Sequence, residues 1–68
     1  MSPKLDRLRS VRESRFMTQQ DLAELASLTV STISRIEAGK EEARFSTVKK
    51  LAAALGVEPG ALVEGGQN

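Results

Sequence analysis

Apolar residues recur at intervals of three and four along most of the chain. The clearest stripe occupies the i, i+3, i+4 and i+7 positions of one helical face: Val48, Leu51, Ala52 and Leu55. No window shows a sustained alternation of apolar and polar residues, which is the pattern of a half-buried strand. The sequence therefore predicts an all-α fold.

Start and stop signals divide the chain into five short helices. Ser2 and Pro3 mark the first start, because serine can cap a helix and proline suits its first position. We expect this helix to run from Pro3 to about Ser14. Ser46 is the expected cap of the fourth helix, and Pro59 opens a short fifth helix.

The second and third helices have stronger signals. Thr18 and Asp21 stand three residues apart, which is the spacing of a capping box. Thr29 is the expected cap of the third helix, and Gly39 suits its left-handed end. Only residues 27–28 separate the second helix from Thr29. Because a connection this short forces a steep crossing, the two helices are predicted to form a helix-turn-helix.

Composition narrows the chemistry that is possible. The 68 residues suffice for one small domain. The chain has neither cysteine nor histidine, which excludes disulfides, ordinary zinc sites and imidazole bases. Since nothing resembles a nucleophile–base pair or a phosphate-binding loop, we expect neither an enzyme nor a cofactor. No apolar run approaches the roughly 20 residues that span a bilayer, and no signal peptide follows Met1, so a cytoplasmic protein is expected.

The net charge of +1 is unevenly distributed. Residues 1–15 have a charge of +3, since five basic residues stand against two acidic ones, and residues 35–50 have a charge of +2, with five against three. The intervening residues 16–34 and the last residues 51–68 have a charge of −2 each. The two basic segments form one face if the fold brings them together; the alternative is an ordinary solvated surface of mixed charge.

At residues 8–63 the sequence resembles the phage-repressor and Cro type of helix-turn-helix DNA-binding domain. The segments that carry this resemblance are 12–13, 18–23, 29–40 and 51–57. It implies a lambda-repressor-like fold for a single domain over residues 1–64, followed by a flexible tail over residues 65–68. It also implies a transcriptional repressor that binds double-stranded DNA sequence-specifically, as a homodimer on a near-palindromic operator.

The resemblance assigns roles to particular residues. It places four side chains of the third helix against bases in the major groove: Thr29, Val30, Ser31 and Arg35. It implies contacts with the DNA backbone for five residues: Arg12, Gln19, Thr32, Lys40 and Arg44. It also pairs Arg12 with Glu37 between the first and third helices.

The chemistry of these side chains agrees with the implied base contacts. Arg35 can donate two hydrogen bonds to guanine O6 and N7, and the methyl groups of Val30 and Thr29 suit thymine methyls. The alternatives are that Thr29 acts as a cap alone and that Arg35 is a solvated surface residue. Glu41 and Glu42 stand where the family often has basic residues, which predicts weaker binding to non-specific DNA.

Three positions depart from the family pattern. One is Ala43, which replaces a frequent proline and predicts a looser loop before the fourth helix. Ser27 stands at the turn where the family usually has glycine, and a left-handed serine there costs about 1 kcal/mol. Phe16 also replaces a common glycine after the first helix. We expect Phe16 to pack over a core that has few large apolar side chains.

The sequence is compatible with several alternatives for the dimer contact and for the main partner of the protein. Leu62 and Val63 either join two copies of the chain or complete the core of one copy. The chain is a stand-alone repressor or, alternatively, the antitoxin or controller protein of a small operon, whose main partner is a toxin or another protein. A third alternative is a helical interaction module that has lost DNA binding.

Overall fold

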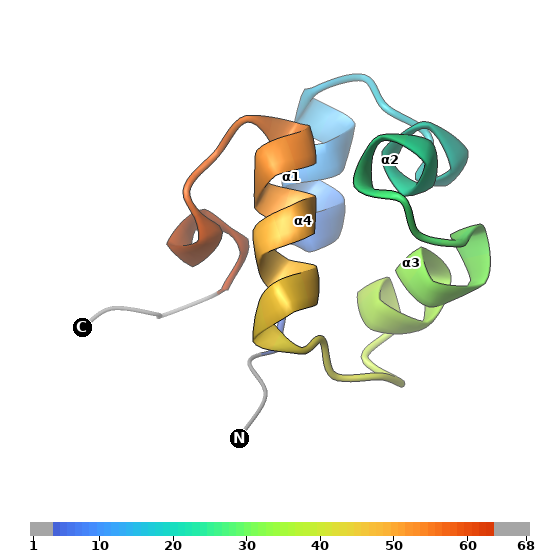
Figure 1. Ribbon diagram of the computed structural model, residues 1–68, viewed down its shortest axis with the longest axis vertical. Helices are drawn as coiled ribbons and strands as arrows, with labels where there is room; N and C mark the ends of the chain where they lie inside the picture. The colour runs from blue at the N-terminus through green and yellow to red at the C-terminus, as the bar shows by residue number, and fades with distance from the viewer. Residues whose placement is uncertain (1–3, 64–68) are drawn as a thin grey trace.

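The computed structural model describes residues 4–63, and every regular element within that range is helical. In chain order the elements are α1 (Leu8–Ser14), α2 (Gln19–Ala26), α3 (Val30–Glu37), α4 (Phe45–Leu55) and η1 (Pro59–Leu62). Figure 1 shows α2 and α3 together on one side of α4, with η1 on the other side. The all-α prediction is confirmed. Ser2, Pro3 and the predicted tail over residues 65–68 lie outside the described residues.

The prediction of five α-helices is wrong, because the last element, η1, is a single 3-10 turn. Its hydrogen bonds join residues three apart: the Ala61 N–H donates to the Glu58 carbonyl at 2.9 Å, and the Val63 N–H donates to the Gly60 carbonyl at 3.4 Å. A four-residue segment that contains glycine has no length for further α-helical turns. Leu62 holds the turn against the domain, since its side chain is completely buried.

The start of the first helix also differs from the prediction. α1 begins at Leu8, while Lys4 and Leu5 are not helical and Arg7 is the N-cap. In a helix that started at Pro3, the Arg7 N–H would bond to the carbonyl four residues earlier. It donates instead to the Leu62 carbonyl at 3.1 Å. This bond ties the segment before α1 to η1.

α4 (Phe45–Leu55) begins two residues before the expected position. Arg44 is the N-cap in extended conformation, and its side chain makes no capping hydrogen bond. Ser46 is therefore the second residue of the helix, and its predicted capping role is wrong. The preceding Ala43 is buried, so the loop is held by packing and the helix starts without a hydroxyl cap.

The core takes one large side chain from each element. The largest completely buried side chains are Leu8, Leu22, Ile33, Leu51 and Leu62, which come from α1, α2, α3, α4 and η1 respectively. Because each short helix buries a single stripe, none of them has a core of its own. Of the two alternatives for Leu62, its burial supports the core. Val63 is half-buried against the same cluster.

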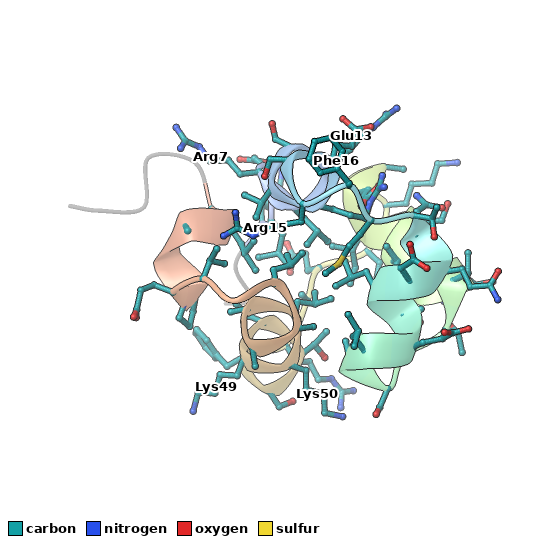
Figure 2. The ribbon with its side chains drawn as sticks, turned by 90° about the horizontal axis from the view of Figure 1, so that it is seen from above. Arg7, Glu13, Arg15, Phe16, Lys49 and Lys50 are labelled. Carbon is teal, nitrogen blue, oxygen red and sulfur yellow. The ribbon has the colours of Figure 1, made fainter. Side chains whose placement is uncertain are left out.

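Within residues 4–63, two residues other than glycine adopt the left-handed conformation. Ser27 ends α2 with φ 59° and ψ 44°, in the backbone geometry that Gly56 provides at the end of α4. Phe16 follows α1 with φ 58° and is 95% exposed, so the prediction that it packs over the core is wrong. The left-handed turn directs this side chain outward, beside Glu13 at the periphery of the molecule (Figure 2).

Parts of the two basic segments lie far apart in the fold. Figure 2 shows Arg7 on one side of the molecule, beyond α1, and Lys49 and Lys50 on the opposite side, beyond α4. Arg15 is engaged within the domain, because its Nε donates to the Leu55 carbonyl at the end of α4 at 3.0 Å. A cation at this position suits the negative end of a helix. Within residues 4–63, no helix is long and apolar enough to cross a membrane.

The strain at Ser27 predicts a stabilising substitution. Glycine adopts this conformation without the steric penalty of a Cβ, but it also makes the unfolded chain more flexible. We expect Ser27→Gly to stabilise the domain by about 0.5 kcal/mol, which raises the Tm by roughly 2–4 °C. Thermal unfolding followed by circular dichroism measures the change. Ser10→Gly, inside α1, is the control and should lower the Tm; a lower Tm for Ser27→Gly as well would contradict the prediction.

Candidate nucleic-acid interface

The start of α2 is held by a reciprocal capping box. The Asp21 N–H donates to Thr18 Oγ1 at 3.0 Å, and the Thr18 N–H donates to Asp21 Oδ2 at 2.9 Å. These two bonds satisfy backbone donors that a helix start leaves free. The capping box predicted from the spacing of these residues is confirmed, and it makes Gln19 the first residue of α2.

The turn between α2 and α3 is as short as the sequence predicted. The Leu28 N–H donates back to the Ala23 carbonyl at 2.8 Å across the left-handed Ser27. Ala23 itself is buried, and a side chain this small allows the two helices to approach closely. Thr29 then caps α3, since its Oγ1 accepts from the Thr32 N–H at 3.1 Å. The chain therefore forms a helix-turn-helix from α2 and α3.

Helix α3 has one buried and one exposed face. Ile33 and Ile36 are buried in the core. Val30, Ser31 and Arg35 are exposed. These are three of the four residues for which contacts in the major groove were predicted. The exposed residues of α3 therefore include a small apolar side chain, a hydroxyl and one long cationic donor, all accessible to a ligand.

The two threonines at the start of α3 are partly committed to the protein. Thr29 is exposed, and its hydroxyl lies 3.0 Å from the hydroxyl of Thr32 in addition to its capping bond. Thr32 is half-buried. The cap thus fixes the orientation of both side chains, and it leaves the Thr29 methyl group free for an apolar contact.

A buried ion pair joins α1 to the end of α3. Arg12 Nε lies 2.6 Å from Glu37 Oε2, and Arg12 Nη2 donates to Glu37 Oε1 at 3.0 Å. The two side chains are 9% and 4% exposed. Arg12 Nη1 donates to the Met17 carbonyl at 2.7 Å, so all three nitrogens of the guanidinium have a protein partner. Arg12 therefore has little surface left for a phosphate, and this geometry supports a structural role for its pair with Glu37.

Gln19 extends the ion pair to α2. Its Nε2 donates to Glu37 Oε1 at 3.0 Å, so this carboxylate receives hydrogen bonds from two different helices. Local sequence patterns do not reveal this bond, because residues 19 and 37 come together only when α2 and α3 cross. As a result, the start of α2 and the end of α3 are held at a fixed distance.

The pKa of Glu37 lies below its ordinary value, and that of Arg12 lies above it. Burial alone would raise the pKa of Glu37, but the hydrogen bonds from Arg12 and Gln19 and the positive charge of Arg12 together outweigh burial. For Arg12, the hydrogen bond to Glu37 raises the pKa more than burial lowers it. Both groups therefore remain ionised at neutral pH.

The loop after α3 carries both signs of charge at the edge of the exposed face. Lys40 and Arg44 are exposed, as a contact with the DNA backbone requires. Arg35, however, forms an ion pair with Glu41, with 2.7 Å between Nε and Oε1. The sequence predicts only a repulsive role for Glu41, because no helical spacing links it to Arg35. Among the residues that the structure describes, no three acidic side chains gather as a metal site.

The buried pair predicts a large difference between two glutamates of equal charge. Glu37→Ala leaves Arg12 buried without its partner, which costs about 3 kcal/mol or more and should lower the Tm by more than roughly 10 °C. Glu42→Ala is the matched control, because Glu42 is exposed and forms no ion pair with any residue that the structure describes. Equal melting temperatures for the two variants would show that the pair contributes nothing.

The lowered pKa of Glu37 also predicts the pH dependence of stability. Its contribution is complete above the unfolded value of about 4.3 and is lost as the pH falls through the lower folded value. We expect the free energy of unfolding to fall below about pH 4.5, and less steeply in Glu37→Gln, which has no charge to titrate. Urea unfolding of both proteins at pH values from about 3 to 6 measures this. Parallel pH profiles would contradict the prediction.

Comparison with known proteins gives consistent results. A family model described as helix-turn-helix, HTH_3, matches residues 8–62. The immunity repressor protein of Bacillus phage phi105 is 37% identical over 57 residues, which are 84% of this chain and 40% of the repressor. The chain thus spans about two fifths of the length of that relative.

Two solved structures superpose closely. The restriction-modification controller protein C.AhdI from Aeromonas hydrophila matches with a TM-score of 0.81 and 35% identity, over 84% of this chain and 86% of the controller. The P22 c2 repressor matches with a TM-score of 0.81 over 96% of this chain and 98% of the repressor chain. The two sequences are 23% identical, so this likeness concerns the fold alone. Because the family model covers all five elements of the structure, this chain belongs to the helix-turn-helix family HTH_3.

Proposed function

We propose that this domain is a transcriptional regulator, acting as a repressor, that binds double-stranded DNA in a sequence-specific manner with α3 in the major groove. One observation carries the proposal: the side chains on one face of α3 are exposed, while the C-terminal end of this helix is held to α1 and α2 through Glu37. A recognition helix needs this combination, since its side chains select bases only if the helix has a fixed position relative to the backbone contacts.

The proposed contacts divide into two classes. Thr29, Val30, Ser31 and Arg35 read base edges, with Arg35 donating to guanine O6 and N7. Contacts with the DNA backbone come from Gln19, Thr32, Lys40 and Arg44. Gln19 is suited to a phosphate because it stands at the first position of α2, where backbone N–H groups point outward.

The regulator is proposed to act as a homodimer on two half-sites about one helical turn apart. A single short α3 covers few base pairs, and twofold symmetry doubles the contacts. Val63 is the better candidate for the dimer contact, because Leu62 is completely buried. Figure 1 shows η1 on the side of α4 opposite to α2 and α3, so a contact there leaves α3 free.

The second candidate function is that of a controller in a small operon, with a toxin or another protein as its main partner. The similarity to a restriction-modification controller, over 86% of that chain, favours this candidate. The similarity to a phage immunity repressor favours the stand-alone repressor. Both functions use the same α3 surface for DNA.

Selection of random DNA duplexes by the purified protein tests the function directly. At near-physiological salt we expect enrichment of a near-palindrome, with a spacing of half-sites that reports the dimer geometry. Enrichment of a single half-site would support DNA reading by the monomer and contradict the homodimer. If no sequence is enriched, the stand-alone repressor is wrong.

Substitutions at Arg35 and Lys40 separate base reading from backbone contact. Arg35→Ala should weaken binding to the selected duplex by roughly 1–3 kcal/mol and relax the preference at one base pair. Lys40→Ala should weaken binding to all sequences alike and reduce the slope of log K against log salt concentration by about 1. Fluorescence anisotropy with the selected and scrambled duplexes measures both effects. An equal loss on every sequence for Arg35→Ala would overturn its role in base reading.

A further inference from the structure

The ion pair between Arg35 and Glu41 engages only one side of the guanidinium. Arg35 Nε donates to Glu41 Oε1 at 2.7 Å, across six positions of sequence. Within residues 4–63, Nη1 and Nη2 of this side chain have no hydrogen-bond partner of their own. Arg35 is 52% exposed and Glu41 is 38% exposed, so the pair lies at the surface beside the free face of α3.

An arginine held in this way differs from a freely rotating one. Its two terminal nitrogens form a fork that matches two acceptors on one edge, such as O6 and N7 of guanine. A long side chain loses rotamer freedom when it binds, and a contact that fixes it beforehand reduces that loss. The bond through Nε therefore leaves the fork open and restricts its direction.

The charge of Glu41 acts differently on bases and on phosphates. A carboxylate beside α3 repels the DNA backbone, and it offsets part of the attraction between Arg35 and any phosphate. A guanine edge in the major groove carries no net charge, so the Glu41 carboxylate repels it less than it repels a phosphate. Guanine can therefore bind the oriented Arg35 fork at a smaller electrostatic cost. The same residue thus weakens contacts that carry no sequence information and favours one that does.

We propose that Glu41 is a specificity-determining positioning residue, which holds Arg35 through Nε so that Nη1 and Nη2 meet a guanine in the major groove. The proposal rests on the proposed function, since it concerns how that function selects its sequence. It requires that the bond between Arg35 and Glu41 persists in the DNA complex. A carboxylate that merely competes with DNA for Arg35 would have to release it.

Two alanine substitutions at neighbouring glutamates distinguish positioning from simple repulsion. Glu41→Ala and Glu42→Ala remove the same charge and the same number of atoms, but only Glu41 contacts Arg35. The binding of each variant is measured with three kinds of DNA. These are the duplex that the wild-type protein selects, duplexes changed at the base pair that Arg35→Ala identifies, and a scrambled duplex.

We expect Glu41→Ala to bind the selected duplex about three- to tenfold more weakly, the range that freezing one long side chain costs, and to bind the scrambled duplex more tightly. Glu42→Ala should bind all duplexes somewhat more tightly and keep the preference at that base pair. In an Arg35→Ala background, Glu41→Ala should no longer weaken binding to the selected duplex. If Glu41→Ala binds every duplex more tightly with an unchanged preference, Glu41 is only a competitor and the proposal is wrong.

Nuclear magnetic resonance of the Arg35 Nε–H group provides a readout that does not depend on affinity. In the free wild type and in Glu42→Ala, we expect a signal shifted by the hydrogen bond and protected from exchange with water, and in Glu41→Ala we expect the protection to be lost. The protection should remain when the selected duplex is added. Its loss in the complex would overturn the proposal and leave the proposed function intact, whereas failure of the wild type to select any sequence would overturn both.

Discussion

One buried carboxylate holds the first three helices of this domain in their relative positions. Glu37 accepts hydrogen bonds from Arg12 on α1 and from Gln19 on α2, while it belongs to the last turn of α3. A charge at this depth is tolerated only because its partners satisfy it, and a partly satisfied pair would be worse than an apolar contact. The orientation of α3, and with it the use of its exposed face, depends on this network.

The core alone would not impose this orientation. Each element contributes one large buried side chain, and apolar packing has no strong directional preference. Hydrogen bonds to a carboxylate do have one, because distances and angles are restricted. The left-handed Ser27 adds a second constraint, since it limits how α2 and α3 can cross. Directional contacts at both ends of α3 thus complement a core that supplies cohesion.

The surface around α3 differs from the buried network, because its exposed side chains use only some of their hydrogen-bonding groups within the protein. The Thr29 cap orders the start of the helix, and Thr29 itself is exposed. The pair of Arg35 with Glu41 orders the end and, within residues 4–63, leaves the nitrogens Nη1 and Nη2 without a partner. These contacts limit the rotamers of side chains that face solvent, which favours selective over indiscriminate binding. Arg7, in contrast, lies on the opposite side of the molecule from Lys49 and Lys50 (Figure 2).

The sequence by itself determined the helical class, the capping box at Thr18, the short turn and the Arg12–Glu37 pair implied by family resemblance, because these depend on local spacing or on a recurrent motif. Tertiary structure decided the rest. The first helix begins late because the Arg7 N–H bonds to Leu62, and the final element stops at one 3-10 turn once Leu62 is buried. The bond of Gln19 to Glu37 and that of Arg35 to Glu41 follow no helical period. They arise only where the chain crosses or turns back on itself, and local sequence patterns do not record such distances.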